Sequence, residues 1–417
     1  MTVISRIILL FVLLLVDFYV FQALKLVTKG CNETLKLIIY YSYWSMTVFA
    51  AVIMILHVFI DSSKWNKAFA TYSFAVIVLT YLSKIFVVLF LLIDDLIRLV
   101  KYISTLFQSR ANTTTESGNV GISRLEFLSQ MGLMIAAVPF FSTIYGMVRG
   151  PFRFEVRKQK LVFSNLPTAF NGLKIVQISD IHSGSFLSTQ PMEDMVNLVM
   201  KQNADVIFFT GDLVNNRNDE MDEFKTILNK IKAPMGVFSI FGNHDYGDYT
   251  SWNSEAEKTA NRKNLIQTHK DLGWNLLLNE HIALQKQDDM IAVIGVENWS
   301  SVMKHPKHGD MVKATKNLPD VPFKILLSHD PTHWHHEVSE KFKDIDLTLS
   351  GHTHGMQYGV EIPGFKWSLV QYVYKEWAGL YNKGKQYIYV NRGVGFIGYP
   401  GRVGIMPEIT VIELSNA

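Results

Sequence analysis

The sequence has only one cysteine, Cys31, among its 417 residues. A single thiol excludes an internal disulfide and any zinc site built from several thiolates. An excess of charge of one sign is also missing, because 40 Lys and Arg residues face 37 Asp and Glu residues. From residue 151 onward the balance is close to neutral. This balance argues against the concentrated positive surface that nucleic-acid binding needs, so we expect no nucleic-acid partner.

Long apolar runs are abundant in the first third of the chain. Each is roughly 18–23 residues long, the length at which a helix crosses a bilayer. A cleaved signal peptide would explain only the first run, and that run lacks a small-residue cleavage site. We therefore predict a transmembrane helical anchor over residues 1–150 and a separate domain over residues 151–417. The four predicted spans are Ile7–Leu24, Ile38–Ile60, Tyr72–Ile93 and Phe127–Met147.

Two ionisable residues, Asp17 and Lys84, fall inside the first and third predicted spans. Such groups are costly in a membrane and usually face a partner or a polar cavity. We predict that they form a structural pair, with a functional role as the alternative. Lys and Arg are divided almost evenly between the two predicted sides, so the positive-inside rule leaves the orientation open.

Short apolar runs in the second part of the chain are each followed directly by a polar cluster. Helical patterns near 190–201 and 220–232 lie between the early runs, which favours an α/β domain with largely parallel central strands. A further alternation over residues 152–163 predicts a hairpin that leads into this domain. The five runs are 173–178, 206–210, 237–240, 325–327 and 346–349.

The polar clusters contain donors for metal ions. Because ligands collect beyond the carboxyl ends of parallel strands, these side chains are expected to converge on one edge. Carboxylate, amide and imidazole donors suit Mn, Fe or Zn. Two such ions about 3.5–4 Å apart polarise phosphoryl oxygens and generate a hydroxide from a shared water near neutral pH. The clusters are Asp180-Ile181-His182, Gly211-Asp212, Gly242-Asn243-His244-Asp245, Ser328-His329 and Gly351-His352-Thr353-His354.

These motifs resemble those of the calcineurin-like metallophosphoesterases, in particular a membrane-anchored bacterial branch. The resemblance covers roughly residues 152–417 and implies a four-layer αββα sandwich of two mixed sheets flanked by helices. It implies that Asp180, His182 and His354 hold a first divalent metal, that Asn243, His329 and His352 hold a second, and that Asp212 bridges the two.

The same resemblance assigns roles to three further residues. His244 would contact the phosphoryl group and protonate the leaving oxygen, and Asp245 would orient it. Arg392, in a tail similar to that of the branch, would either reach a phosphate or form a structural salt bridge. Met356 replaces a glycine that is usual there, which affects substrate shape rather than ligation. We expect the remaining histidines of this region, His305, His308, His333, His335 and His336, not to bind metal directly.

The substrate is less defined than the reaction. The segment 360–399 is rich in aromatic residues, which either belong to the core or form an apolar wall beside the metals. The branch is associated with the pyrophosphate of UDP-2,3-diacylglucosamine, a lipid A precursor, so a lipid-linked phosphoester in the bacterial inner membrane is the substrate that the resemblance favours. The alternatives are a catalytically silent membrane scaffold or sensor and, less favoured because repeats are missing, a transporter with an accessory hydrolase. The side of the membrane and the oligomeric state stay open.

Overall fold

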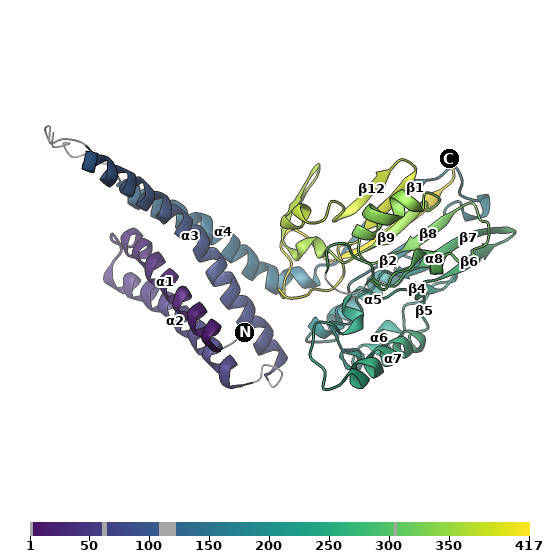
Figure 1. Cartoon of the computed structure of the whole chain (residues 1–417), viewed down its shortest axis with the longest axis horizontal. Helices are drawn as coiled ribbons and strands as arrows, with labels where there is room; N and C mark the ends of the chain where they lie inside the picture. Colours follow the sequence, from purple (N-terminus) through teal and green to yellow (C-terminus); the bar gives the residue numbers. More distant parts are fainter. Residues whose placement is uncertain (1–2, 61–64, 108–121, 304–306) are drawn as a thin grey trace. The chain divides into compact units, whose positions relative to one another are not determined.

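The computed structural model describes residues 3–60, 65–107, 122–303 and 307–417. The chain forms two compact units, Met1–Tyr145 and Gly146–Ala417 (Figure 1). Among the described residues up to Arg149, four helices are long and apolar enough to cross a membrane. They are α1 (Val3–Val27), α2 (Glu33–Phe59), α3 (Lys67–Phe107) and α4 (Arg124–Arg149).

Helix α3 extends well beyond the predicted third span. Its 41 residues correspond to roughly 60 Å, about twice the thickness of a bilayer's hydrocarbon core. The extension carries Asp94, which forms ion pairs with Arg98 in the same helix and with Arg124 in α4. The helix therefore continues past the predicted third span as a segment that carries both charged and exposed apolar side chains.

The predicted pairing of Asp17 with Lys84 is confirmed. The two side chains form a buried ion pair between α1 and α3. Tyr81 donates a hydrogen bond of 2.8 Å to Oδ2 of Asp17, and Tyr43 donates one of the same length to its backbone carbonyl. The ammonium of Lys84 also lies over both tyrosine rings. These contacts compensate both charges where they are buried among the helices.

Two six-stranded mixed sheets form the centre of the second unit. The first has the order β1-β14-β2-β3-β4-β5, in which β2 to β5 are parallel and β14 is antiparallel to β2. Its strands are β1 (Glu155–Val162), β2 (Lys174–Ile178), β3 (Val206–Phe209), β4 (Val237–Ser239), β5 (Asn275–Leu276) and β14 (Glu408–Ser415).

The second sheet has the order β12-β13-β9-β8-β7-β6, with parallel pairing from β13 through β7 and antiparallel edges. A separate antiparallel pair is formed by β10 (Gly359–Ile362) and β11 (Phe365–Ser368). The strands of the second sheet are β6 (Glu280–Lys286), β7 (Asp289–Gly295), β8 (Lys324–Leu327), β9 (Leu347–Ser350), β12 (Gly379–Lys383) and β13 (Gln386–Val390).

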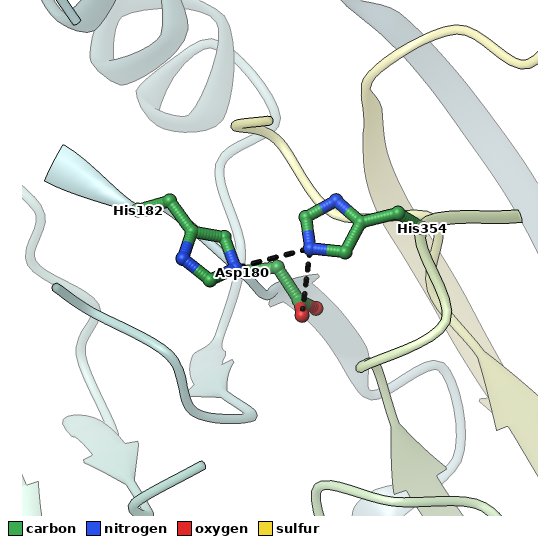
Figure 2. Close-up of side chains that lie close together, drawn as sticks. All are labelled: Asp180, His182 and His354. Atoms are coloured by element: carbon green, nitrogen blue, oxygen red, sulfur yellow. Dashed lines mark hydrogen bonds and ion pairs between the residues drawn. The ribbon is translucent and has the colours of Figure 1, made fainter. Parts of the chain in front are cut away.

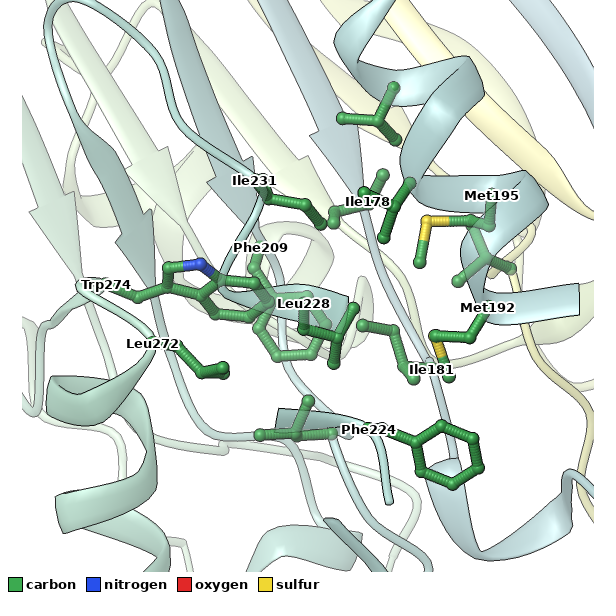
Figure 3. Close-up of a cluster of buried hydrophobic side chains, with 14 of the residues drawn as sticks. Ile178, Ile181, Met192, Met195, Phe209, Phe224, Leu228, Ile231, Leu272 and Trp274 are labelled. Carbon is green, nitrogen blue, oxygen red and sulfur yellow. The ribbon is translucent and has the colours of Figure 1, made fainter. Parts of the chain in front are cut away.

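Three hydrophobic clusters hold the layers together. One lies between the sheets, where Phe208 and Phe238 of the first meet Val293 and Ile325 of the second. Another covers the outer face of the first sheet, where its residues meet those of the flanking helices (Figure 3). The third covers the second sheet. The helices are α5 (Gln190–Met200), α6 (Lys225–Leu228) and α7 (Glu255–Asp271) on the first sheet, and α8 (Met311–Ala314), a π-helical turn (Trp334–Val338) and α9 (Ser339–Lys341) near the second. The predicted four-layer sandwich is thereby confirmed.

Two local predictions were wrong. Residues 152–163 do not form a hairpin, because β1 is a single strand that pairs in parallel with β14, some 250 residues later. The alternating pattern reflected an edge strand whose partner is distant in sequence. The helix predicted over 220–232 is broken into a 3-10 turn, Asn218–Met221, and the single turn of α6.

Candidate metal centre

The seven predicted ligands all follow the carboxyl ends of strands in the two sheets. Asp180 and His182 follow β2, Asp212 follows β3 and Asn243 follows β4 in the first sheet. His329 follows β8, and His352 and His354 follow β9 in the second sheet. Since the strands within each set are parallel, their ends share one edge, and the side chains meet there.

The backbone at this edge is strained. Five of the seven residues have a positive φ, with values of 53° for Asp180, 48° for His182, 59° for Asp212, 72° for His352 and 50° for His354. A non-glycine residue in this region costs of order 1–3 kcal/mol and persists only where the surrounding structure imposes it. Such a concentration is typical of a functional site, where side chains must point in directions that ordinary strand ends do not allow.

Two glycines make room for the carboxylates. A Cβ on Gly242 would lie 2.2 Å from Oδ1 of Asp212, and one on Gly351 would lie 2.2 Å from Oδ2 of Asp180. Both approaches are too close for any other residue. The turns after β4 and β9 therefore need glycine to let the two carboxylates reach the shared edge.

A first group of donors consists of Asp180, His182 and His354 (Figure 2). The Nε2 atoms of the two histidines are 3.1 Å apart, and Nε2 of His354 is 3.3 Å from Oδ1 of Asp180. All three side chains are buried. The backbone N–H of His352 donates to both oxygens of the Asp180 carboxylate at 3.0 Å, which fixes its orientation.

A second group consists of Asp212, His329 and His352. Nε2 of His329 is 3.1 Å from Oδ2 of Asp212, and it is 3.3 Å from Nδ1 of His352. Asn243 joins this group, because its Oδ1 lies 2.8 Å from Nδ1 of His352. The Nδ1 atom of His329 donates to the carbonyl of Thr210 at 2.7 Å, which directs Nε2 toward the centre.

The protonation of these groups fits cation binding. Burial lowers the pKa values of His182, His352 and His354, so their imidazoles are neutral donors. Burial alone would also lower the pKa of His329, but Asp212 and Asp180 raise it to about 10. Burial would raise the pKa of Asp180, yet His354 and His329 hold it below its usual range. The two carboxylates thus stabilise positive charge at this edge.

His244 lies at the rim of this centre, half-buried. Its ring stacks on Tyr249 with a centroid distance of 4.3 Å, and its Nδ1 lies 2.8 Å from the carbonyl of Asn215. Since a carbonyl only accepts, Nδ1 carries a proton in this hydrogen bond and Nε2 is the ring nitrogen that does not contact Asn215. Its backbone N–H donates to Oδ1 of Asp212 at 2.8 Å, which ties its position to the metal-binding edge.

The prediction that Asp245 orients His244 needs correction. The imidazole is held by Asn215, whereas the Asp245 carboxylate accepts hydrogen bonds from the backbone N–H groups of Gly242, Asp212, Leu213 and Val214. Burial, together with the charge of Asp212, raises the pKa of Asp245 to about 7, and the amide donors oppose this rise. Asp245 thus joins the turns after β3 and β4, and it acts on His244 only through the backbone.

Of the two roles considered for Arg392, contact with a phosphate or a structural salt bridge, the structure favours the salt bridge. Its guanidinium is almost fully buried and forms ion pairs with Glu361 and Glu408. It is therefore part of a structural salt bridge. Sequence reasoning had also left Arg402 without a role, although this fully buried residue donates to the carbonyls of Arg392 and Gly393 and places Nη2 3.2 Å from Nδ1 of His354.

Three other residues contact the centre, and of these the sequence had indicated only Tyr374, as a member of the aromatic segment 360–399. The hydroxyl of Tyr374 is 2.9 Å from Nε2 of His352, and Oδ2 of Asp330 is 3.5 Å from the same atom. The hydroxyl of Tyr249 accepts from Nδ2 of Asn243 at 2.9 Å, which turns the amide oxygen inward. Asp330 directly follows His329 and had a local signal, but the tyrosines come from loops with no motif.

The other histidines lie outside both donor groups, as far as the structure describes them. His333 is buried and contacts Ser328, while His308 stacks on Tyr246. His335 pairs with Glu376, and His336 is exposed. His305 lies outside the described residues.

Comparison with known proteins gives a consistent result. A family model described as "Calcineurin-like phosphoesterase" matches residues 173–356, and one described as "Probable Calcineurin-like phosphoesterase, transmembrane domain" matches residues 2–151. The metallophosphoesterase YkuE of Bacillus subtilis, itself uncharacterized, is 31% identical over 71% of this chain and 98% of its own length. The phosphodiesterase YaeI of Escherichia coli is 29% identical over 70% and 99%.

A eukaryotic relative shares the combination of parts. A "Transmembrane protein with metallophosphoesterase domain" of Danio rerio is 28% identical over 74% of this chain and 67% of its own length. In this chain the membrane helices come first, and the sandwich with the buried Asp/His groups follows them. The chain belongs to the calcineurin-like metallophosphoesterase family, as an integral membrane protein whose second domain is a phosphoester hydrolase.

Proposed function

We propose that the protein hydrolyses a phosphodiester or pyrophosphate bond with the help of two divalent cations, Mn, Fe or Zn. The first cation is held by Asp180, His182 and His354, and the second by Asn243, His329 and His352. Bound there, the pair would polarise the phosphoryl oxygens and lower the pKa of a water molecule. Carboxylate, amide and imidazole donors without thiolates suit these metals.

The observation that carries this proposal is the position of one oxygen atom. Oδ2 of Asp212 lies 3.6 Å from Nε2 of His182 in the first group and 3.1 Å from Nε2 of His329 in the second. Oδ1 is occupied by the backbone N–H of His244. A single carboxylate oxygen therefore faces both donor groups, which is what a bridging ligand requires.

The protein's own groups complete the chemistry. His244 stands beside the donor groups with Nδ1 fixed on Asn215, so Nε2 can deliver a proton to the leaving oxygen. Tyr249 stacks on the imidazole and limits its rotation. Asp245 holds the backbone of Asp212 and Gly242 together, so that the proton donor and the bridging carboxylate keep a fixed separation.

A lipid-linked substrate fits the surroundings of the site. The aromatic segment divides between core residues, such as Trp377 and Tyr389, and residues that face outward, such as Phe365 and Tyr372. Tyr374 connects the outward part to His352. Together with the membrane helices, this supports a phosphoester lipid of the bacterial inner membrane, such as UDP-2,3-diacylglucosamine, as the substrate class.

The reaction can be tested on the full-length protein in detergent, supplied with Mn²⁺ and a chromogenic phosphodiester. We expect turnover by the wild type and a loss of at least about 100-fold in Asp212→Asn, because the bridging carboxylate organises both cations. The matched control is Asp344→Asn, which removes an exposed carboxylate and should leave turnover intact. A wild type that binds metal but never turns over would instead identify a silent scaffold.

The substrate class needs a separate assay. The protein is incubated in turn with diacylated UDP-glucosamine and with phospholipids, and the water-soluble products are analysed. Release of a nucleoside monophosphate or a phosphorylated headgroup supports the lipid proposal. Turnover of the chromogenic ester without any product from the lipids would refute the lipid substrate while leaving the phosphoesterase intact.

A further inference from the structure

The β10–β11 pair and the residues on either side of it carry an unusual concentration of exposed apolar side chains. Among the described residues from 152 onward, half of all exposed large apolar side chains fall within residues 356–373. These are Met356, Val360, Ile362, Phe365, Leu369, Tyr372 and Val373, called here the apolar patch. The other half are scattered singly: Phe152, Val162, Leu187, Tyr249, Met290, Val302 and Val312. Single exposed residues need no explanation, but a contiguous patch marks an interaction surface.

The polarity of the β10–β11 pair is reversed relative to an ordinary surface hairpin. Val360 pairs with Trp367 and Ile362 with Phe365 on one face, and Ile362 and Phe365 are 58% and 53% exposed. Glu361 is on the other face, with Lys366 as its cross-strand neighbour. A surface hairpin normally buries its apolar face and exposes its polar face to water.

The charged face of this pair is the one attached to the domain. Glu361 accepts hydrogen bonds of 2.8 and 3.0 Å from Arg157 in β1, and it also pairs with Arg392. Lys366 donates to the carbonyl of Ala378 and to the hydroxyl of Tyr381. Ion pairs and hydrogen bonds therefore fix the pair with its apolar side outward, and this orientation is part of the fold.

The apolar patch adjoins the place where the chain enters the domain from its last membrane helix. The final residues of α4, from Gly146, belong to the second unit. The N–H of Arg402 donates to the carbonyl of Gly146 at 3.1 Å, and the N–H of Gly359, at the start of β10, donates to the carbonyl of Val403 at 2.9 Å. Two hydrogen bonds and one dipeptide thus connect the end of α4 to β10.

The chain passes from α4 into β1 over a short connection. A 3-10 turn, Gly150–Phe152, follows α4 directly, and β1 begins at Glu155. The cations of this short connection, Arg149 and Arg153, are exposed, as is Lys158 in β1. Cations next to a membrane helix favour anionic lipid headgroups. The charges and the apolar side chains near this entry point are thus those of a surface that meets a bilayer.

We infer that the apolar patch is a membrane-docking surface that inserts Ile362, Phe365 and their neighbours into the lipid interface beside the metal centre. The occupant is the bilayer itself, since the patch is fixed outward and its strand β10 is connected through Arg402 and Val403 to Gly146, near the end of a helix that is long and apolar enough to cross a membrane. The surface also reaches the site: Tyr374, which follows the patch, contacts His352, and Met356 lies two residues after His354. A lipid held at this surface would present its headgroup to the candidate metal centre. This link between docking and catalysis rests on the proposed function.

The docking is tested on the full-length protein in nanodiscs that contain anionic lipids. An NBD fluorophore is attached at Phe365→Cys in a Cys31→Ser background, and lipids with a spin label in the acyl chain serve as the quencher. The matched control carries the fluorophore at Val312→Cys in α8, which is 74% exposed. Interfacial insertion places side chains roughly 5–10 Å into the boundary of headgroups and acyl chains, so we expect quenching at least about twofold stronger at position 365.

Two results would overturn the inference. Equal quenching at both positions would show that the patch stays in water. A blue-shifted probe at position 365 that spin-labelled lipids do not quench would show that a second copy or another protein covers the patch.

A second variant connects the surface to catalysis. In Ile362→Glu/Phe365→Glu, we expect turnover of a soluble chromogenic phosphodiester to be unchanged. Turnover of a long-chain alkyl nitrophenyl phosphodiester dissolved in the nanodisc should fall by about tenfold, because two apolar anchors are lost. An equal fall on both substrates would contradict a docking role. If the wild type turns over neither, the proposed function fails, while the quenching experiment still decides the docking surface.

Discussion

Replacement of Arg392 by methionine tests whether this residue supports the fold or the substrate. Its guanidinium compensates Glu408, whose side chain is completely buried and receives further hydrogen bonds only from its neighbours Tyr389 and Thr410 among the described side chains. Methionine keeps most of the aliphatic stem but removes the charge. Glu408 is then left as a buried carboxylate without its closest cation, since Arg157 lies 4.0 Å away.

The size of the effect follows from burial. Removing one partner of a buried ion pair costs about 3–5 kcal/mol, because the remaining charge is uncompensated. For a domain of this size each kcal/mol lowers the melting temperature by about 2–4 °C, so the expected fall is roughly 6–20 °C. Adding Glu408→Gln to Arg392→Met should restore a large part of this loss, since the buried charge disappears.

The assay is thermal unfolding of the full-length protein in detergent, with turnover measured well below the transition. Lys160→Met is the matched control, because Lys160 forms an ion pair with Glu413 at the surface, where such pairs contribute at most about 1 kcal/mol. We expect kcat/KM of Arg392→Met to stay near that of the wild type at low temperature. A large loss of kcat/KM with an unchanged melting temperature would refute the structural role and return Arg392 to the substrate.

Three further predictions concern pH, the membrane helices and metal removal. Burial lowers the pKa of His269 to about 3, so the folded state keeps this side chain neutral while the unfolded state binds a proton below about pH 6.5. The free energy of unfolding should therefore fall by up to about 1.4 kcal/mol per pH unit between pH 6.5 and 3. In denaturant titrations, His269→Gln should reduce this slope. Lys84→Met should destabilise the full-length protein in thermal unfolding by leaving Asp17 buried without its cation, and adding Asp17→Asn should recover stability; no recovery would contradict a purely structural pair. Removal of metal with a chelator should lower the melting temperature by roughly 5–10 °C for each ion held at about 100 times its Kd, and excess Mn²⁺ should reverse the change. An unchanged melting temperature would argue against bound metal.

The strand ends could be predicted because their signal is local. An apolar run followed at once by Asp, Asn or His, as at Asp180 or His329, predicts both a buried strand and a polar group at its carboxyl end. The order of strands and helices along the chain then predicts a parallel sheet, and the carboxyl ends of parallel strands lie at one edge of that sheet. The convergence of the candidate ligands on one edge could therefore be predicted without distant contacts, whereas the four layers and the assignment of ligands to two metals came from the resemblance to the family.

The remaining features depend on partners that are distant in sequence. Residues 152–163 were predicted to form a complete hairpin, because the strand with which they pair, β14, lies some 250 residues away. Arg392 had two possible roles until Glu361 and Glu408 were placed beside it. The role of Asp245 depends on the backbone of the turn after β3, and adjacency to His244 in the sequence suggested a contact that the fold does not make. Likewise, no sequence pattern predicts a positive φ at five donor residues.

The central claim is that Asp212 joins two cations, and the metal content of the protein tests it most directly. The full-length protein and its Asp212→Asn variant are loaded with Mn²⁺, desalted and analysed by mass spectrometry of the metal, with Asp344→Asn as the control. The account predicts about two ions per chain for the wild type and the control, and about one or fewer for Asp212→Asn. One ion per chain in the wild type, or two retained in Asp212→Asn, would contradict it.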